Sequence, residues 1–363
     1  MSNAYLILEN GTVFKGRAFG YEAEAIGELV FSTGMTGYME TLTNPGYLGQ
    51  MVLQTFPLIG NYGVVPAEQK SPQVQLKAYI VREWCQEPSN FRSEGNLDTF
   101  LRENKTPGLC DIDTRALTHI IRENGSMNAM LSHTPELSEA QWAVLKGYKL
   151  RRATKTEEDE FPIRKISGQH NAGFDAQSQG QTRSVVVWDF GDRSITQNLA
   201  DCGFNPVTVI KHSATADEIL HMASGGLVLS DGPGDPAQYA EEIRTIKRIC
   251  EKGLPIFGIG LGHQLLALAR GAKTEKLPFG HRGTNQPVRE TATGRVFVTK
   301  QSHGFAVAVD SLPGTAQMSY ENTIDGTCEG IDYTDIPAFS IQFQPSPDTD
   351  TFGKFMKMIK KGV

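Results

Sequence analysis

The stretch that most constrains the fold is residues 256–264, which read I-F-G-I-G-L-G-H-Q. The apolar run ending at Ile259 predicts a buried strand, and the apolar residues after His263 predict a helix. Three glycines predict a sharp turn between them, because glycine enters positive φ without steric cost. This arrangement is typical of a nucleophile elbow, which presents one side chain above a sheet, beside helix N–H groups that stabilise an oxyanion.

The tip of this elbow falls on Gly260, so the position of the nucleophile carries no side chain. An ordinary glycine-rich turn between a strand and a helix is the alternative that these nine residues leave open.

The length, charge and cysteines of the chain limit its class. With 363 residues, about two domains are expected. The net charge of −6 comes from mixed acids and bases, which argues against a nucleic-acid binder. We expect neither a membrane segment nor a signal peptide, because no long apolar run or basic leader occurs. The cysteines are scattered along the chain and never occur in a C-x-x-C spacing; they are Cys85, Cys110, Cys202, Cys250 and Cys328. We therefore expect no disulfide framework and no metal site. A reducing, cytoplasmic location follows from the same observation.

Residues 1–147 predict a β-rich first domain. Strand-like runs at 5–8, 12–14 and 28–31 are separated by glycine turns, and residues 32–50 are dense in Gly, Tyr and Thr, which indicates further tight turns. A helix is predicted over 113–123, with Asp113 or Thr114 as its cap and Gly125 as its stop.

The composition and the hydrophobic pattern of the chain change after residue 147 and again after residue 183. Residues 148–183 are rich in Gln, Ser, Gly and charges, which indicates an inter-domain linker. Residues 184–363 alternate between strands and helices. This alternation predicts a doubly wound α/β sheet with its site at the carboxyl ends of the strands.

Three further turns are expected to meet the elbow at those strand ends. Residues 230–236, S-D-G-P-G-D-P, hold backbone N–H groups open to a carboxylate or oxyanion, or form a merely rigid turn. Residues 301–305, Q-S-H-G-F, include His303, which is a catalytic candidate. A histidine in such a turn is more often packed or hydrogen-bonded than catalytic. Residues 343–347, F-Q-P-S-P, offer Gln344 and Ser346, and neither is a general base at neutral pH.

Motifs spread over both domains occur in one order. In the first domain they are L-E-N-G-T-V-F-K-G (8–16), G-E-L-V-F-S-T-G-M-T-G-Y (27–38), F-P-L-I-G-N-Y-G (56–63) and D-I-D-T-R-A-L-T (111–118). In the second they are W-D-F-G (188–191), L-S-D-G-P-G-D-P (229–236), F-G-I-G-L-G-H-Q-L-L-A-L-A (257–269) and F-G-H-R-G (279–283). The second set resembles the class I glutamine amidotransferases. The whole chain is similar to the family of carbamoyl phosphate synthetase small subunits.

This resemblance implies an N-terminal β-rich α/β domain followed by a doubly wound class I glutamine amidotransferase-like domain. It also implies a subunit that hydrolyses glutamine and passes ammonia to a large synthetase subunit, which makes carbamoyl phosphate for pyrimidine and arginine synthesis. We expect no cofactor in this chain, because ATP and bicarbonate would belong to the large subunit. The family uses a cysteine at the elbow tip, and a histidine and a glutamate in the motif F-H-P-E. These positions fall on Gly260, Gln344 and Ser346, so all three catalytic side chains are missing.

The glutamine pocket that the resemblance implies is kept only in part. A family serine falls on Gly46, a family asparagine falls on Ser302, and Asp231 replaces the usual asparagine. Each lost polar contact is worth about 1 kcal/mol or more. The positions that match are Gly232, Gly234, Leu261, Gln264, Gly304 and Phe305.

Three functions remain open from the sequence. Because loss of a covalent nucleophile costs about a millionfold in rate, the first is a small subunit that docks on a large subunit but has lost glutamine hydrolysis. The second is a glutaminase that uses Ser302, His303 or Cys250 as its nucleophile. The third is a non-catalytic module whose intact glycine loop senses glutamine or a related small acid.

Overall fold

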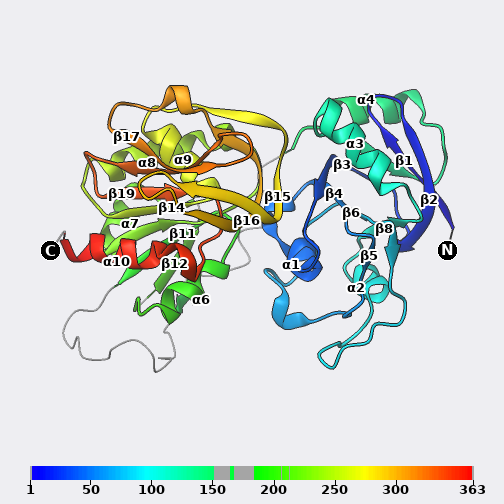
Figure 1. Cartoon of the computed structure of the whole chain (residues 1–363), viewed down its shortest axis with the longest axis horizontal. Helices are drawn as coiled ribbons and strands as arrows, with labels where there is room; N and C mark the ends of the chain where they lie inside the picture. Colours follow the sequence, from blue (N-terminus) through cyan, green and yellow to red (C-terminus); the bar gives the residue numbers. More distant parts are fainter. Residues whose placement is uncertain (1, 151–163, 167–183, 206, 212, 362–363) are drawn as a thin grey trace. The chain divides into compact units, whose positions relative to one another are not determined.

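The computed structural model describes residues 2–150, 164–166, 184–205, 207–211 and 213–361. The chain forms two compact units (Figure 1). The first unit is Met1–Arg152 together with Leu277–Asn285, and the second is Ala153–Lys276 together with Gln286–Val363. The sequence gives no sign that residues 277–285 return to the first unit, because they lie inside the predicted second domain.

The first unit is built on a closed barrel in the strand order β1-β2-β8-β6-β4-β3-β9. Neighbouring strands β3, β4, β6 and β8 run parallel, and the other barrel pairings are antiparallel. This architecture confirms the β-rich α/β domain expected from the sequence. The strands are β1 (Asn3–Leu8), β2 (Val13–Gly20), β3 (Ala25–Ser32), β4 (Gln50–Gln54), β6 (Ala78–Ile80), β8 (Pro107–Cys110) and β9 (Met127–Ser132), with β5 (Leu58–Ile59) and β7 (Glu83–Trp84) paired outside the barrel.

Alternate barrel residues pack on different helices. Leu29 lies in a buried cluster with Leu117 of α3, whereas Val30 lies in a second cluster with Met39 of α1 and Leu97 of α2. This period of two places an apolar layer on each side of the strands. The helices are α1 (Tyr38–Thr43), α2 (Leu97–Glu103), α3 (Thr114–Asn124) and α4 (Glu139–Gly147), with 3₁₀ turns η1 (Pro45–Tyr47) and η2 (Pro66–Glu68).

Helix α3 begins and ends where the sequence predicts. The Asp113 carboxylate accepts a hydrogen bond from the Ala116 N–H at 2.9 Å, and Gly125 follows the last turn with φ 86°. Residues 32–50, for which the sequence indicated tight turns, also contain the helix α1 between those turns. Tyr38, Met39 and Leu42 are buried at helical spacing, so packing against the barrel outweighs the low helix propensity of the neighbouring glycines.

The second unit is organised on one mixed sheet in the order β10-β12-β11-β13-β14-β19-β18-β16-β15-β17. Strands β12, β11, β13, β14 and β19 are parallel, and β18 turns the sheet antiparallel. Their bounds are β10 (Arg164–Ile166), β11 (Val185–Asp189), β12 (Val207–Lys211), β13 (Gly226–Leu229), β14 (Ile256–Ile259), β15 (Thr274–Glu290), β16 (Val296–Val307), β17 (Ala316–Asn322), β18 (Cys328–Tyr333) and β19 (Ala338–Ile341).

Helices cover both faces of the parallel strands, which confirms the doubly wound fold. On β11, Val186 packs in a cluster with residues of α7, α8 and α9, while Val187 packs with residues of α6 and α10. The helices are α6 (Ser194–Asp201), α7 (Ala216–Met222), α8 (Ala240–Cys250), α9 (Leu261–Ala269) and α10 (Thr351–Lys361), with 3₁₀ turns η3 (Pro236–Gln238), η4 (Val309–Ser311) and η5 (Pro347–Thr349).

Most of the predicted linker, residues 148–183, lies outside the described residues. Its described part includes β10, which pairs antiparallel with β12 and so belongs to the sheet of the second unit. Across the described residues, no helix combines the length and the apolar character that a membrane crossing requires.

Candidate functional site

The nucleophile elbow forms at the carboxyl end of β14, which has the parallel neighbours β13 and β19. Gly260 has φ 55° and ψ −113°, its N–H donates to the Ile341 carbonyl at 2.9 Å, and α9 begins at the next residue. The sequence assigned positive φ to all three glycines, but Gly258 and Gly262 do not have it. They are needed for close packing, because a Cβ on Gly258 would lie 2.8 Å from the Gly262 carbonyl oxygen.

A carboxylate from a neighbouring loop occupies the space at the elbow tip. Oδ1 of Asp231 accepts hydrogen bonds from the backbone N–H groups of Gly232 at 2.8 Å and Leu261 at 2.9 Å. A Cβ added at Gly260 would overlap this carboxyl group. The two N–H groups that would face an oxyanion therefore already hold an internal anion. In the sequence, this contact could have been suspected because an acid stands at position 231 and a glycine stands at the elbow tip.

The loop that carries Asp231 is fixed by several short hydrogen bonds. The Ser230 hydroxyl accepts from the Phe190 N–H at 2.8 Å and donates to the Asp231 carbonyl at 2.9 Å. The Tyr239 hydroxyl donates to the Pro233 carbonyl at 2.9 Å. Gly234 has φ 93°, which glycine adopts without strain. These hydrogen bonds restrain the loop, and its acid lies on the elbow.

Gln344 and Ser346 lie in the loop that follows β19, the parallel neighbour of β14. The Gln344 N–H donates to the Lys300 carbonyl at 3.0 Å, and Ser346 caps the short turn η5. The carboxyl ends of β14 and β19 lie at the same edge of the sheet. An amide and a hydroxyl at this edge cannot accept a proton at neutral pH.

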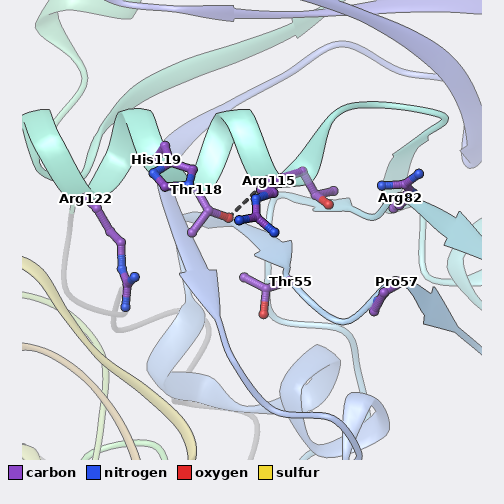
Figure 2. Close-up of a pocket in the computed structure, with 8 residues that line it drawn as sticks. Thr55, Pro57, Arg82, Arg115, Thr118, His119 and Arg122 are labelled. Carbon is purple, nitrogen blue, oxygen red and sulfur yellow. Dashed lines mark hydrogen bonds between the residues drawn. The ribbon is translucent and has the colours of Figure 1, made fainter.

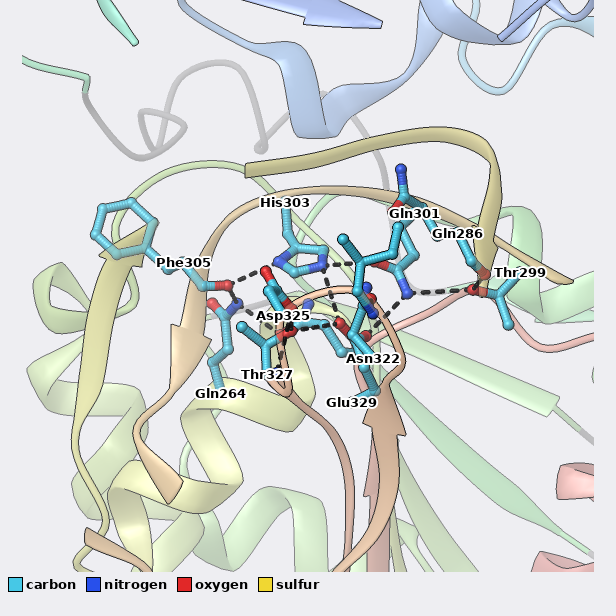
Figure 3. Close-up of polar contacts among 12 residues, drawn as sticks. Gln264, Gln286, Thr299, Gln301, His303, Phe305, Asn322, Asp325, Thr327 and Glu329 are labelled. Atoms are coloured by element: carbon cyan, nitrogen blue, oxygen red, sulfur yellow. Dashed lines mark hydrogen bonds and ion pairs between the residues drawn. The ribbon is translucent and has the colours of Figure 1, made fainter. Parts of the chain in front are cut away.

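Residues 301–305 do not form the predicted turn, because they lie inside β16. The buried positions Gln301 and His303 alternate with the half-buried Ser302 and Gly304, as expected for a strand. Gln264 of α9 faces this strand, and its Nε2 donates to the Phe305 carbonyl at 2.7 Å (Figure 3). The same Nε2 donates to the Gln342 side chain at 2.8 Å. Both amide hydrogens of Gln264 are therefore used within the protein.

His303 belongs to a buried polar network, in which its Nε2 also lies 3.9 Å from Oε1 of Glu329. Its Nδ1 lies 2.8 Å from the Phe305 carbonyl and its Nε2 lies 3.0 Å from Oε1 of Gln301 (Figure 3). Nε2 of Gln301 in turn donates to Glu329 at 2.9 Å, and Glu329 is fully buried. Both ring nitrogens are thus engaged in fixed contacts.

Among the described residues, no hydrogen bond joins the other two candidate nucleophiles, Cys250 and Ser302, to a base. Cys250 is buried in the α8 core, and burial raises its pKa to about 11. The Ser302 hydroxyl is buried and has no hydrogen-bond partner within the described residues. His263, the first polar residue after the elbow, is fully buried with Nδ1 2.8 Å from the Ser340 hydroxyl, and burial lowers its pKa to about 3.

The remaining residue of the predicted pocket lies in the first unit. Gly46 sits in η1, where its N–H donates to the Asn44 side chain at 3.0 Å. Its assignment to a glutamine pocket stays a prediction.

Known families match the chain over both units. Residues 6–131 match the CPSase domain of the carbamoyl-phosphate synthase small chain, and residues 186–357 match the class-I glutamine amidotransferase domain. Three curated relatives, each named carbamoyl phosphate synthase small chain, come from Clostridium perfringens (43% identical, covering 98% of this chain and 99% of the relative), Symbiobacterium thermophilum (40%, 93% and 92%) and Bacillus cereus (42%, 98% and 95%). This chain therefore belongs to the family of carbamoyl phosphate synthase small chains.

Proposed function

We propose that this chain is a small subunit that docks on a large carbamoyl phosphate synthase subunit and does not itself hydrolyse glutamine. The observation that carries the proposal is the Asp231 carboxylate, which accepts from the Gly232 and Leu261 N–H groups beside a tip that has no side chain. ATP and bicarbonate would bind to the large subunit, and its product would serve pyrimidine or arginine synthesis.

Three parts of amide hydrolysis are affected together. The reaction needs a nucleophile, a group that takes its proton, and N–H donors for the developing oxyanion. Gly260 supplies no nucleophile, and Gln344 and Ser346 supply no base. The Asp231 carboxylate would repel a second anion at the N–H pair, so electrostatics add to the missing chemistry.

The alternatives are less consistent with the geometry. A glutaminase that used Cys250, Ser302 or His303 would need an exposed, activated group, whereas these are buried in the core, lack a base or are held in a network. A sensor of small acids would need free N–H groups at the elbow, and Asp231 already occupies them.

The proposal is tested by co-expressing the chain with its cognate large subunit. We expect the two chains to co-purify, and the complex to make carbamoyl phosphate from ATP and bicarbonate with ammonium but not with glutamine. A large subunit purified alone is the control for ammonium-dependent synthesis. Synthesis with glutamine at a rate close to that with ammonium would contradict the proposal, and failure to co-purify would remove its docking part.

A further inference from the structure

The barrel unit carries an open surface cavity of about 440 Å³ beside α3, and the arginines that line it are exposed to solvent (Figure 2). Its walls combine three threonines with three arginines, namely Thr55, Thr114, Thr118, Arg82, Arg115 and Arg122. Five of the lining residues come from α3, including Arg115, which belongs to the D-I-D-T-R-A-L-T motif. Nothing in glutamine hydrolysis calls for this set of residues.

The cavity lies where α/β folds place their ligands. Strands β4, β6 and β8 are parallel neighbours, so their carboxyl ends meet at one edge of the barrel. Thr55 directly follows β4, Arg82 comes two residues after β6, and α3 follows β8. The Asp111 N–H donates to the Arg82 carbonyl at 2.9 Å, which ties the segment before α3 to the one that carries Arg82. Binding sites of parallel sheets form at this edge because loops from several strands converge there.

The cavity carries a concentrated positive charge. None of its lining residues is acidic, and within the described residues Arg82 and Arg115 form no ion pair. Arg122 lies over the Phe31 ring with its guanidinium 5.9 Å from the ring centroid. The acids that precede α3 act elsewhere, because Asp111 pairs with Arg17 at 3.2 Å and Asp113 caps the helix.

The arginines are the permanently charged donors that the cavity offers. The hydroxyl of Thr118 donates to the Thr114 carbonyl at 2.7 Å, and that of Thr55 donates to the Ser32 carbonyl at 3.1 Å, so both hydroxyl hydrogens are used. Figure 2 shows Arg115 and Arg122 projecting from α3 on the side that faces Thr55. A guanidinium presents a planar pair of N–H groups that matches a phosphate or carboxylate.

We propose that this cavity binds a small molecule bearing at least two oxyanion groups, either phosphate or carboxylate. Several separate guanidinium groups balance more than one negative charge. The volume lies in the range of small-molecule sites and exceeds the size of a single inorganic phosphate.

Calorimetric titration of the purified full chain at low ionic strength tests this site. Pyrophosphate and citrate serve as probes, so that the two titrations distinguish phosphate from carboxylate. We expect saturable one-site binding by at least one probe, weakened about tenfold in Arg115→Gln and partly restored in Arg115→Lys. Arg82→Gln provides an independent variant if Arg115→Gln does not fold.

Arg102→Gln is the matched control, because Arg102 lies in the same unit, carries the same charge and pairs with Asp98 at 2.7 Å away from the cavity lining. Binding by Arg102→Gln should equal that of the natural chain. The absence of saturable binding by both probes, or an equal loss in Arg102→Gln and Arg115→Gln, would overturn the proposal.

Discussion

Oδ1 of Asp231 accepts a hydrogen bond from the Leu261 N–H at 2.9 Å, which places an acid of one loop on the first residue of α9. A carboxylate at a helix N-terminus is stabilised by the helix dipole and the open N–H groups. It fits here because Gly260 has no Cβ. The absent nucleophile and the acid that takes its place thus depend on each other.

Restoring a side chain at the elbow should be costly while Asp231 is present. Gly260→Ala places a Cβ on the carboxyl group, and we expect it to lower the free energy of unfolding by about 1–3 kcal/mol more than the backbone strain alone. Gly253→Ala is the control for a side chain at positive φ without the overlap, since Gly253 has φ 67° and open space at its Cβ. Denaturant unfolding of both variants measures the two losses in free energy of unfolding. If the two losses are equal, the overlap with the Asp231 carboxyl group costs no stability, which would contradict the prediction.

Removal of the acid should expose an unpaired N–H pair. In Asp231→Ala the Gly232 and Leu261 N–H groups lose their acceptor, and we expect a loss of about 1–3 kcal/mol in the free energy of unfolding. Asp231→Asn keeps an acceptor oxygen and should lose less. The control is Asp235→Ala, which removes an exposed contact to the Ala237 N–H. A loss in Asp231→Ala no larger than in Asp235→Ala would contradict the proposed role of the carboxylate.

Gln264 should tolerate an acid poorly. Both partners of its Nε2 are oxygens, on Phe305 and Gln342, so Gln264→Glu would bring three acceptors together in a buried place. We expect thermal denaturation to report a loss of about 2 kcal/mol or more at neutral pH. Gln86→Glu makes the same charge change at an exposed position and should alter stability little. Similar melting temperatures for the two variants would indicate that Gln264 is not held as described.

Buried His263 should make stability depend on pH below neutrality. Burial lowers its pKa from 6.5 to about 3, so the unfolded chain binds a proton more readily than the folded chain between these values. The contribution is fully present above pH 6.5 and is lost as pH falls toward 3, with a slope of about 1.4 kcal/mol per pH unit within that window.

His263→Gln removes this titration and should flatten the curve of unfolding free energy against pH between about 4 and 6.5. His221→Gln, on α7 near the surface, is the control and should leave the slope close to that of the natural chain. Parallel curves for His263→Gln and the natural chain would contradict a neutral buried imidazole.

The elements with strong local signals could be predicted from the sequence. The elbow at Gly260 and helix α3 between Asp113 and Gly125 follow from glycine geometry and capping, which act over a few residues. The doubly wound order follows from alternating strands and helices. These features depend on short-range rules that tertiary contacts do not overturn.

Long-range contacts set the features that could not be predicted. Residues 301–305 form strand because partner strands pair with them, although Gly304 gives them the look of a turn. The return of residues 277–285 to the first unit depends on contacts such as the Ser126 N–H to the Pro278 carbonyl, 152 residues away. The Asp231 contact is also non-local, so the sequence showed the substitution at position 231 but not where its carboxylate lies.

The central claim is tested most directly by the release of ammonia from amide-labelled glutamine by the purified complex with the large subunit. We predict that ammonia release by this complex equals the release by complexes that carry Asp231→Ala or Gly260→Ala. Those complexes give the non-enzymatic background. The reason is that no nucleophile acts at the elbow. Release well above that background at an ordinary enzymatic rate, retained through purification to homogeneity, would contradict the account.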